Sequence, residues 1–173
     1  MITIISGTNR SGSVTLSVSR KVLELLTSSE IDAQLLDLQK LPKDFVFKND
    51  VFGDADPGFS AIVDQFVTTA DRFVFVIPEY NGGFPGVCKA FIDAIEPKNF
   101  KGKKAALIGL SAGRAGNLRG TDQLTGVLNY LDVSTVPKPV NILHVAGQLN
   151  EEGQLTDDHT AEAITRLLER LLD

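Results

Sequence analysis

The sequence is poor in cysteine and tryptophan and lacks a long apolar run. Among its 173 residues one is cysteine and none is tryptophan, which excludes an internal disulfide framework and a thiolate metal cluster. The longest apolar run, Phe73 to Ile77, ends at Pro78 and is far too short for a membrane span. No basic segment precedes a long apolar stretch at the start, so we expect a soluble, cytoplasmic protein without a secretory signal.

An excess of positive charge is also absent. The chain has 17 Lys and Arg against 22 Asp and Glu, a net charge of −5 that argues against general nucleic-acid binding. With 43% apolar and 23% charged residues it has the composition of a globular protein that buries a full core. Its length suits a single domain over residues 1–173.

Five short apolar segments predict β-strands. Ile2–Ile5, Phe73–Ile77 and Ala105–Leu110 do not alternate apolar with polar residues, which is typical of parallel strands covered on both faces. We also expect strands at Asp32–Leu38 and Val140–Val145.

Segments of helical periodicity separate these strands, at 18–26, 62–67, 85–95, 124–131 and 161–171. A β-α order repeated five times predicts a three-layer, doubly wound α/β fold, with a five-stranded parallel sheet of order 2-1-3-4-5 and helices on both faces. Thr156 is the expected N-cap of the last helix, and the connection from Gln39 to Pro57 is expected to be an irregular surface loop.

Ligands of such sheets bind beyond the carboxyl ends of the strands, here between the first and third strands. Three loops meet this condition: Ser6–Thr15, Pro78–Gly86 and Ser111–Arg119. We call them the phosphate loop, the ring loop and the third loop.

The phosphate loop has the composition of an anion cradle. Five Ser and Thr hydroxyls and Arg10 precede a helix N-terminus, whose N–H groups and dipole favour an anion. Gly7 and Gly12 have Walker A spacing, but the Lys-Ser/Thr pair is missing, and Asn9 replaces the second glycine of the dinucleotide motif. We predict a single terminal phosphomonoester, such as that of FMN. The alternative is a turn whose polar residues only cap a helix.

The ring loop is suited to a planar ligand. Prolines stiffen its ends, and Gly82-Gly83 allows unusual backbone angles. The loop can therefore present backbone groups to a ring edge while Tyr80 or Phe84 covers a face. The alternative is a turn with its aromatic side chains in the core. Together with the small residues of the third loop, the three loops predict one site with a phosphate end and a flat end.

These loops resemble a known family. Gly7–Ser13 is similar to the G-S-x-R-x-x-S opening of the NADPH-dependent FMN reductase family, and Pro78–Asn81 with Pro85-Gly86 resembles its P-E-Y-N-x-x-x-P-G signature. The third loop is similar to the family's third glycine-rich loop, and the similarity covers nearly the whole chain. The resemblance implies a flavodoxin-like homodimer or homotetramer that binds FMN and reduces flavins, quinones, azo dyes or chromate.

The resemblance also implies the cofactor-binding residues, position by position. Those implied for the phosphate end are Thr8, Arg10, Ser13, Val14 and Thr15; those for the ring end are Pro78, Glu79, Tyr80, Asn81, Gly82, Ser111 and Gly113. Thr8 and Thr15 replace the family's usual Ser and Asn but keep hydrogen-bonding side chains. Cys88 and Ala90 stand where Leu and Asn are common in the family, and we expect these two differences to affect packing.

The implied function is an FMN-dependent NAD(P)H oxidoreductase that passes electrons by a ping-pong route to a small-molecule acceptor. Such chemistry belongs to the cofactor, so we name no catalytic and no metal-binding residue. Two alternatives stay open. One is a non-enzymatic flavodoxin-type electron carrier, which the lack of Trp and the small net charge disfavour. The other is a flavin-free binding module on the same scaffold.

Other candidate groups receive structural interpretations. Cys88 is expected to fill apolar space rather than act in redox chemistry, and His144 to be a structural residue of its strand. Asp157–His159 looks like a ligand cluster in composition alone, because consecutive helical residues point in different directions. The basic run from Lys98 to Lys104 is typical of a solvated turn, with assistance to a cofactor phosphate as the alternative.

A shallow site made from three loops leaves a flat ring exposed, and a neighbouring subunit can cover it. We therefore expect a homodimer or homotetramer. Glu79, or an aromatic residue among Phe45, Phe47 and Phe52, is expected near the interface.

Overall fold

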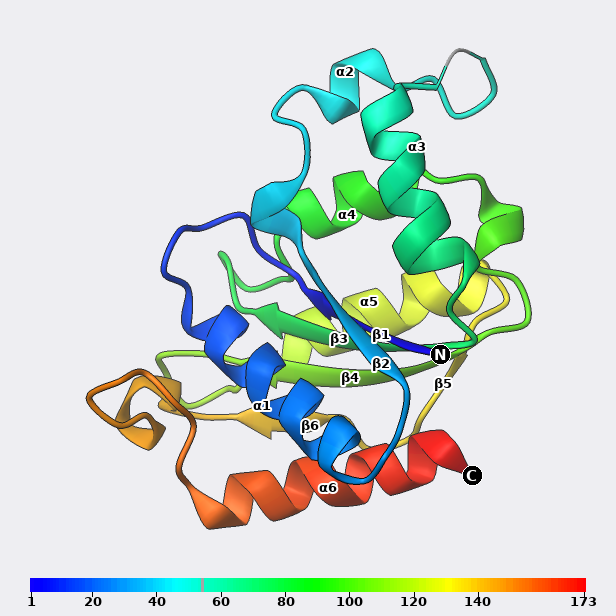
Figure 1. Cartoon of the computed structure of the whole chain (residues 1–173). Coiled ribbons are helices and arrows are strands. Elements are labelled where there is room, and N and C mark those ends of the chain that lie inside the picture. The colour runs from blue at the N-terminus through cyan, green and yellow to red at the C-terminus, as the bar shows by residue number, and fades with distance from the viewer. Residues whose placement is uncertain (54) are drawn as a thin grey trace.

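The computed structural model describes residues 1–53 and 55–173. Within this part of the chain six strands form one parallel sheet (Figure 1). They are β1 (Ile2–Ser6), β2 (Ala33–Asp37), β3 (Arg72–Pro78), β4 (Lys104–Leu110), β5 (Ser134–Thr135) and β6 (Val140–Ile142). The order is β2-β1-β3-β4-β5, and β6 also pairs with β4. The predicted doubly wound sheet is confirmed.

The helices are α1 (Val14–Ser28), α2 (Phe45–Lys48), α3 (Pro57–Val63), α4 (Gly86–Asp93), α5 (Leu118–Tyr130) and α6 (Asp158–Leu172). Each predicted helical segment overlaps one of them, and the helical turn Asp64–Thr68 prolongs α3. Among the described residues no helix has the length and apolar character needed to cross a membrane.

The N-cap of α6 is Asp157 and not Thr156. The Thr160 N–H donates to the Asp157 carboxylate at 2.7 Å, and this hydrogen bond holds the pKa of Asp157 below its ordinary value. A carboxylate is the better cap here because it also meets the positive end of the helix dipole. Asp157–His159 is therefore a capping segment, as its spacing predicted.

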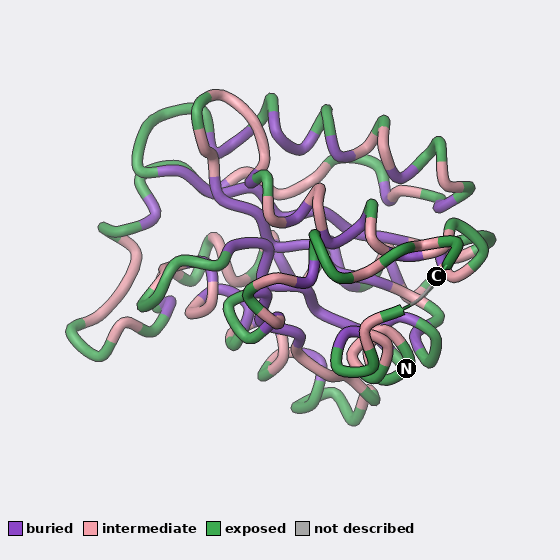
Figure 2. Tube along the Cα trace, turned by 90° about the horizontal axis from the view of Figure 1, so that it is seen from above, coloured by how far each residue is buried: buried purple, intermediate pink, exposed green. Residues whose placement is uncertain are grey.

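The side chains of the central strands alternate between two apolar cores. In β3, Phe73 and Phe75 face α3, α4 and α5, whereas Val74 and Val76 face α1 and α6. Figure 1 shows α1 and α6 on one side of the sheet and α3, α4 and α5 on the other, and Figure 2 shows buried strands at the centre of the molecule. Burial on both faces explains why these strands are continuously apolar.

The fifth strand differs from its prediction, because two short strands, β5 and β6, share its position beside β4. β5 pairs with the beginning of β4, and β6 pairs with its end. Pro137 and Pro139 lie between them and lack the N–H groups that a continuous ladder needs. β6 stops at Ile142, so the predicted strand to Val145 is too long.

The connection from Gln39 to Pro57 is only partly a surface loop. It contains α2, whose Phe45 is buried and stacks on Phe59 with 5.1 Å between ring centroids. Phe45 therefore belongs to the core and is not available for a subunit interface, which corrects the expectation for this residue. Phe47 and Phe52 are 93% and 88% exposed.

Close packing at Gly109 ties β4 to the third loop, and a methyl group there should disturb it. A Cβ at Gly109 would lie 2.5 Å from the Gly116 carbonyl oxygen and 2.8 Å from Asn141 Nδ2. We expect Gly109→Ala to lower the free energy of unfolding by about 1–3 kcal/mol, as measured by urea denaturation. Gly147→Ala is the matched control because a Cβ there meets nothing within 4 Å. Equal stability of the two variants would contradict the prediction.

Candidate functional site

The register of β1, β3 and β4 brings the three loops to one edge of the sheet. Ser6 lies opposite Val76, and Pro78 lies opposite Leu110. Beyond these pairs the Gly7 N–H donates to the Val76 carbonyl at 2.8 Å, and the Glu79 N–H to the Leu110 carbonyl at 2.9 Å. The loops therefore leave neighbouring strands side by side, as expected at the switch point of a doubly wound sheet.

The phosphate loop is pressed against β3 at its start and open at its tip. A Cβ at Gly7 would lie 2.7 Å from the Ile77 side chain, so only glycine allows this close approach. Gly12 has a positive φ of 61°, and a Cβ there would meet nothing within 4 Å. Ser13 caps α1 by accepting a hydrogen bond from the Leu16 N–H at 3.4 Å. The capping interpretation therefore holds for the Ser13 hydroxyl, whereas the tip of the loop is free.

Tyr80 of the ring loop contacts the phosphate loop. Its hydroxyl lies 2.6 Å from Thr8 Oγ1, and the Arg10 guanidinium carbon lies 3.9 Å from the centre of its ring. Thr8 is fully buried and also accepts a hydrogen bond from the Arg10 N–H at 3.3 Å. The structure thus unites residues that the sequence assigned to the two ends of the site.

The ring loop is a tight turn with unusual backbone angles. Asn81 and Gly82 have φ of 52° and 79°, and Tyr80 and Gly83 exchange two backbone hydrogen bonds of 2.9 and 3.1 Å. This is the geometry of an Asn-Gly turn of type I′. The positive φ angles fall on Asn81 and Gly82, not on the predicted Gly82-Gly83 pair. Phe84 is half-buried and packs against the core.

The third loop is held by its own polar groups. Ser111 Oγ accepts a hydrogen bond from the Gly116 N–H at 2.9 Å and donates to the Gly113 carbonyl at 3.0 Å. The Ser111 hydroxyl therefore has a role within the loop. Gly113 is exposed, and a Cβ there would meet nothing within 4 Å.

Two residues at this loop were missed or misplaced by sequence reasoning. Buried Asn117 precedes α5 with a φ of 63° and donates from Nδ2 to the Ile77 carbonyl at 3.0 Å, which ties the third loop to β3. His144 is exposed, lies outside any strand, and makes a 3.1 Å hydrogen bond from Nδ1 to the Ala112 carbonyl oxygen. The signal for Asn117 is an asparagine beside glycine, a pattern that favours left-handed backbone.

The three loops fit a phosphorylated planar ligand. Gly12, Gly82 and Gly113, one from each loop, all face open space. α1 has no acidic residue in its first turn, so its N-terminus stays favourable for an anion. The described residues contain no group of three or more His, Cys, Asp or Glu that could hold a metal ion. These features leave room at the three loops and favour an anion at the start of α1.

Other candidate groups lie away from this chemistry. The lysine run precedes β4 at the amino end of the sheet, where Lys104 donates to the Arg170 carbonyl at 2.8 Å. This position, at the opposite end of the strands from the three loops, favours the interpretation as a solvated turn. Cys88 is fully buried, and burial raises the pKa of its thiol to about 12, in agreement with a packing role.

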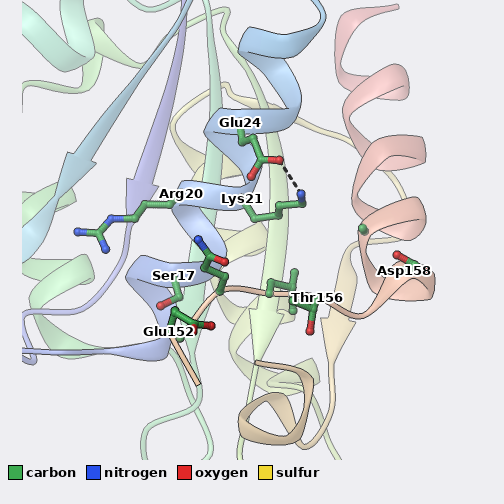
Figure 3. A pocket seen from close by; sticks show the side chains of 11 residues that line it. Ser17, Arg20, Lys21, Glu24, Glu152, Thr156 and Asp158 are labelled. Atoms are coloured by element: carbon green, nitrogen blue, oxygen red, sulfur yellow. Dashed lines mark hydrogen bonds and ion pairs between the residues drawn. The ribbon is translucent and has the colours of Figure 1, made fainter. Parts of the chain in front are cut away.

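A polar cavity of about 640 Å³ lies between α1 and α6 (Figure 3). Arg20, Lys21 and Glu24 of α1 and Asp158 of α6 line it, and Glu152 lies near Ser17 of α1 (Figure 3). Lys21 is already paired with Glu24 at 2.7 Å. Its mixed charge makes it a poor match for a flavin phosphate, and none of its lining residues belongs to the three loops.

The sheet order and the layers of helices on both faces define a flavodoxin-like α/β protein. A NAD(P)H:acceptor oxidoreductase of Paracoccus denitrificans, FerB, superposes with a TM-score of 0.83 over 99% of this chain and 94% of that one, at 24% identity. An archaeal flavodoxin superposes with a TM-score of 0.67 over 99% and 97% of the chains, at 13% identity. These likenesses show the fold.

The chain belongs to the NADPH-dependent FMN reductase family, whose model matches residues 1–148. It is 34% identical to an NAD(P)H-dependent FMN reductase of Pseudomonas aeruginosa, over 96% of this chain and 90% of that protein. It is 25% identical to a quinone reductase of Pseudomonas putida, over 98% and 91%. The protein is thus an oxidoreductase that uses FMN with NAD(P)H as the electron donor, which confirms the predicted enzyme class.

The buried thiol gives a testable expectation. At pH 8 the native protein should not react with a disulfide thiol reagent, whereas the denatured chain should react fully. Because the folded state keeps the thiol protonated up to about pH 12, the contribution of Cys88 to stability is complete below the unfolded pKa of 9.0. Above it, the free energy of unfolding should fall by about 1.4 kcal/mol per pH unit relative to Cys88→Ala. Rapid labelling of the native protein would contradict this.

Proposed function

We propose that the three loops bind FMN with its phosphate at the start of α1 and its ring system along the ring loop. The proposed contacts are those of Thr8, Arg10, Ser13, Val14, Thr15, Pro78, Glu79, Tyr80, Asn81, Gly82, Ser111 and Gly113. The observation that carries the proposal is the set of three open glycines at the carboxyl ends of adjacent strands. The whole chain, residues 1–173, serves as this one domain.

The chain's own groups divide into anion donors and ring donors. Val14 and Thr15 provide N–H groups at the first turn of α1, and Arg10 provides a cation. Within the described residues the N–H groups of Asn81 and Gly82 donate to no protein acceptor, so they are free to meet carbonyl oxygens at a ring edge. Such donors stabilise negative charge on the ring without a side-chain acid.

FMN, when bound, supplies the electron-transfer chemistry between the nicotinamide and the acceptor. The chain leaves one face of the site open beside exposed Asn81 and Gly113. We infer a ping-pong order, in which the oxidised nicotinamide leaves before the acceptor enters, because both would meet the flavin at the same exposed face. Quinones are the proposed acceptors because several relatives are named quinone reductases. A cytoplasmic location fits the supply of NAD(P)H.

The activity is tested on purified protein loaded with FMN. We expect NADPH or NADH to bleach the flavin band and a benzoquinone to restore it. Initial rates at several acceptor concentrations should give parallel double-reciprocal lines. Intersecting lines would contradict the ping-pong order. A protein that accumulates a one-electron flavin state with negligible NAD(P)H oxidation would instead be an electron carrier.

Arginine substitutions test the position of the phosphate. Arg10→Ala should raise the dissociation constant of FMN about tenfold or more, because hydrogen bonds to charged groups contribute roughly 1.5–3 kcal/mol. Flavin fluorescence quenching measures this constant. Arg20→Ala is the matched control, since Arg20 is also exposed but lies in the cavity between α1 and α6 (Figure 3). A stronger effect at Arg20 would move the phosphate to that cavity.

A second copy of this chain is the proposed cover of the flat end of the site. Two cavities of about 600 and 710 Å³ lie beside α4, and both are lined by Val51, Phe52, Lys89 and Asp93. Tyr130 of α5, 91% exposed, lines the first. We call these five residues the aromatic face.

The aromatic face continues into the ring loop and suits a two-fold interface. Gly86, the last residue of the ring loop, lines the larger cavity, so we expect a copy seated here to approach Glu79 at the other end of that loop. Phe52 and Tyr130 together expose roughly 300 Å² or more of aromatic surface, a sizeable part of the ~800 Å² that each partner of a stable dimer buries. Lys89 and Asp93 form an ion pair at 2.7 Å. The face thus carries a charge of each sign, and in a two-fold dimer each could meet the opposite charge of the other copy.

Charged substitutions test the proposed dimer. Phe52→Asp and Tyr130→Asp should convert a dimer to a monomer and weaken FMN binding, as measured by light scattering after size exclusion and by flavin quenching. Leu143→Asp is the control, since Leu143 is 43% exposed but lies after β6, away from the aromatic face. A wild-type monomer, or a dimer that persists in both variants, would contradict the proposal.

A further inference from the structure

Tyr80, Thr8 and Arg10 form a closed circuit of contacts between two loops. The Tyr80 hydroxyl meets Thr8 Oγ1 at 2.6 Å, Thr8 Oγ1 accepts the Arg10 N–H at 3.3 Å, and the Arg10 guanidinium returns to the Tyr80 ring at 3.9 Å. Thr8 is fully buried, and the type I′ turn fixes the Tyr80 backbone through two hydrogen bonds to Gly83. Burial therefore holds Thr8 in place, and the turn holds the Tyr80 backbone in place.

The contact with the Tyr80 ring leaves the N–H groups of the Arg10 guanidinium free to bind an anion. A guanidinium stacked on an aromatic ring uses its flat face, while its N–H groups stay in the plane and point outward. Those edges match two oxygens of a phosphate. Within the described part of the chain Arg10 forms no ion pair with a carboxylate, so no protein anion competes for them.

The contact with Tyr80 affects ligand binding because it orders the Arg10 side chain before the ligand arrives. An exposed arginine side chain samples many rotamers, and ordering it on binding lowers affinity. The Tyr80 ring orders Arg10 in advance. The same contact does nothing for a flavin without a phosphate, because Arg10 then has no anion to meet.

We infer that Tyr80 is a positioning residue that acts through Arg10 and makes the protein select FMN over riboflavin. The inference rests on the proposed function, since it requires the flavin phosphate to lie at the phosphate loop. In the proposed function the Tyr80 backbone lies along the flavin ring, whereas the inference concerns its side chain. A direct ring contact by the Tyr80 side chain would instead strengthen the binding of both flavins alike.

The test compares FMN and riboflavin binding to the full chain freed of flavin, by fluorescence quenching. Tyr80→Leu removes the stacked ring and should raise the dissociation constant of FMN about tenfold, with less than a twofold change for riboflavin. Tyr80→Phe keeps the ring, loses the bond to Thr8, and should raise the FMN constant about threefold. The phenylalanine variant keeps the turn packing, so it carries the test if the leucine variant fails to fold.

A double-mutant cycle separates action through Arg10 from action on the ring. In the Arg10→Ala background, Tyr80→Leu should change the dissociation constant of FMN less than twofold. Equal losses for FMN and riboflavin, or a full loss that persists without Arg10, would overturn the inference while the proposed function stands. Wild-type protein that binds neither flavin would overturn the proposed function, and this inference with it.

Discussion

The parallel register of β1, β3 and β4 is the constraint on which the site depends. Because Ser6 is level with Val76 and Pro78 with Leu110, three loops start from one edge. α1 lies on one face of the sheet, with α4 and α5 on the other, and this divergence opens the crevice between β1 and β3. Small residues near this crevice are enough to let a ligand reach its backbone N–H groups.

Interactions between the loops then fix their shape. Gly7 lets the phosphate loop approach Ile77, and Asn117 reaches the carbonyl of the same residue from the third loop. Tyr80 and Thr8 join the ring loop to the phosphate loop. The polar side chains of the site therefore act largely on one another, and the surfaces left for a ligand are backbone groups and Arg10. This arrangement agrees with chemistry that belongs to a cofactor rather than to an acid or base of the chain.

None of the residues that line the cavity between α1 and α6 belongs to the three loops, whereas a cavity beside α4 reaches the end of the ring loop at Gly86. The cavity between α1 and α6 is roomy but carries mixed charge, and the cavities beside α4 are apolar and belong to the aromatic face. The proposed flavin site is instead a shallow edge formed by three loops. The proposed second copy would cover both this edge and the exposed rings of Phe52 and Tyr130, which are apolar surfaces that water does not favour.

The sequence by itself determined the first four strands, the helices other than α2, their order and the three loops, because apolar runs and helical periods are local and because glycines and prolines mark loops directly. The motifs of the phosphate and ring loops also identified the family. Only the tertiary structure decided that Phe45 is core, that the position of the fifth strand is divided around Pro137 and Pro139, and that His144 lies beside the third loop. It alone joined Tyr80 to Arg10 and assigned the positive φ to Asn81. Such facts depend on contacts between segments distant in the chain, and residue type and spacing carry no information about which of several polar partners a folded loop selects.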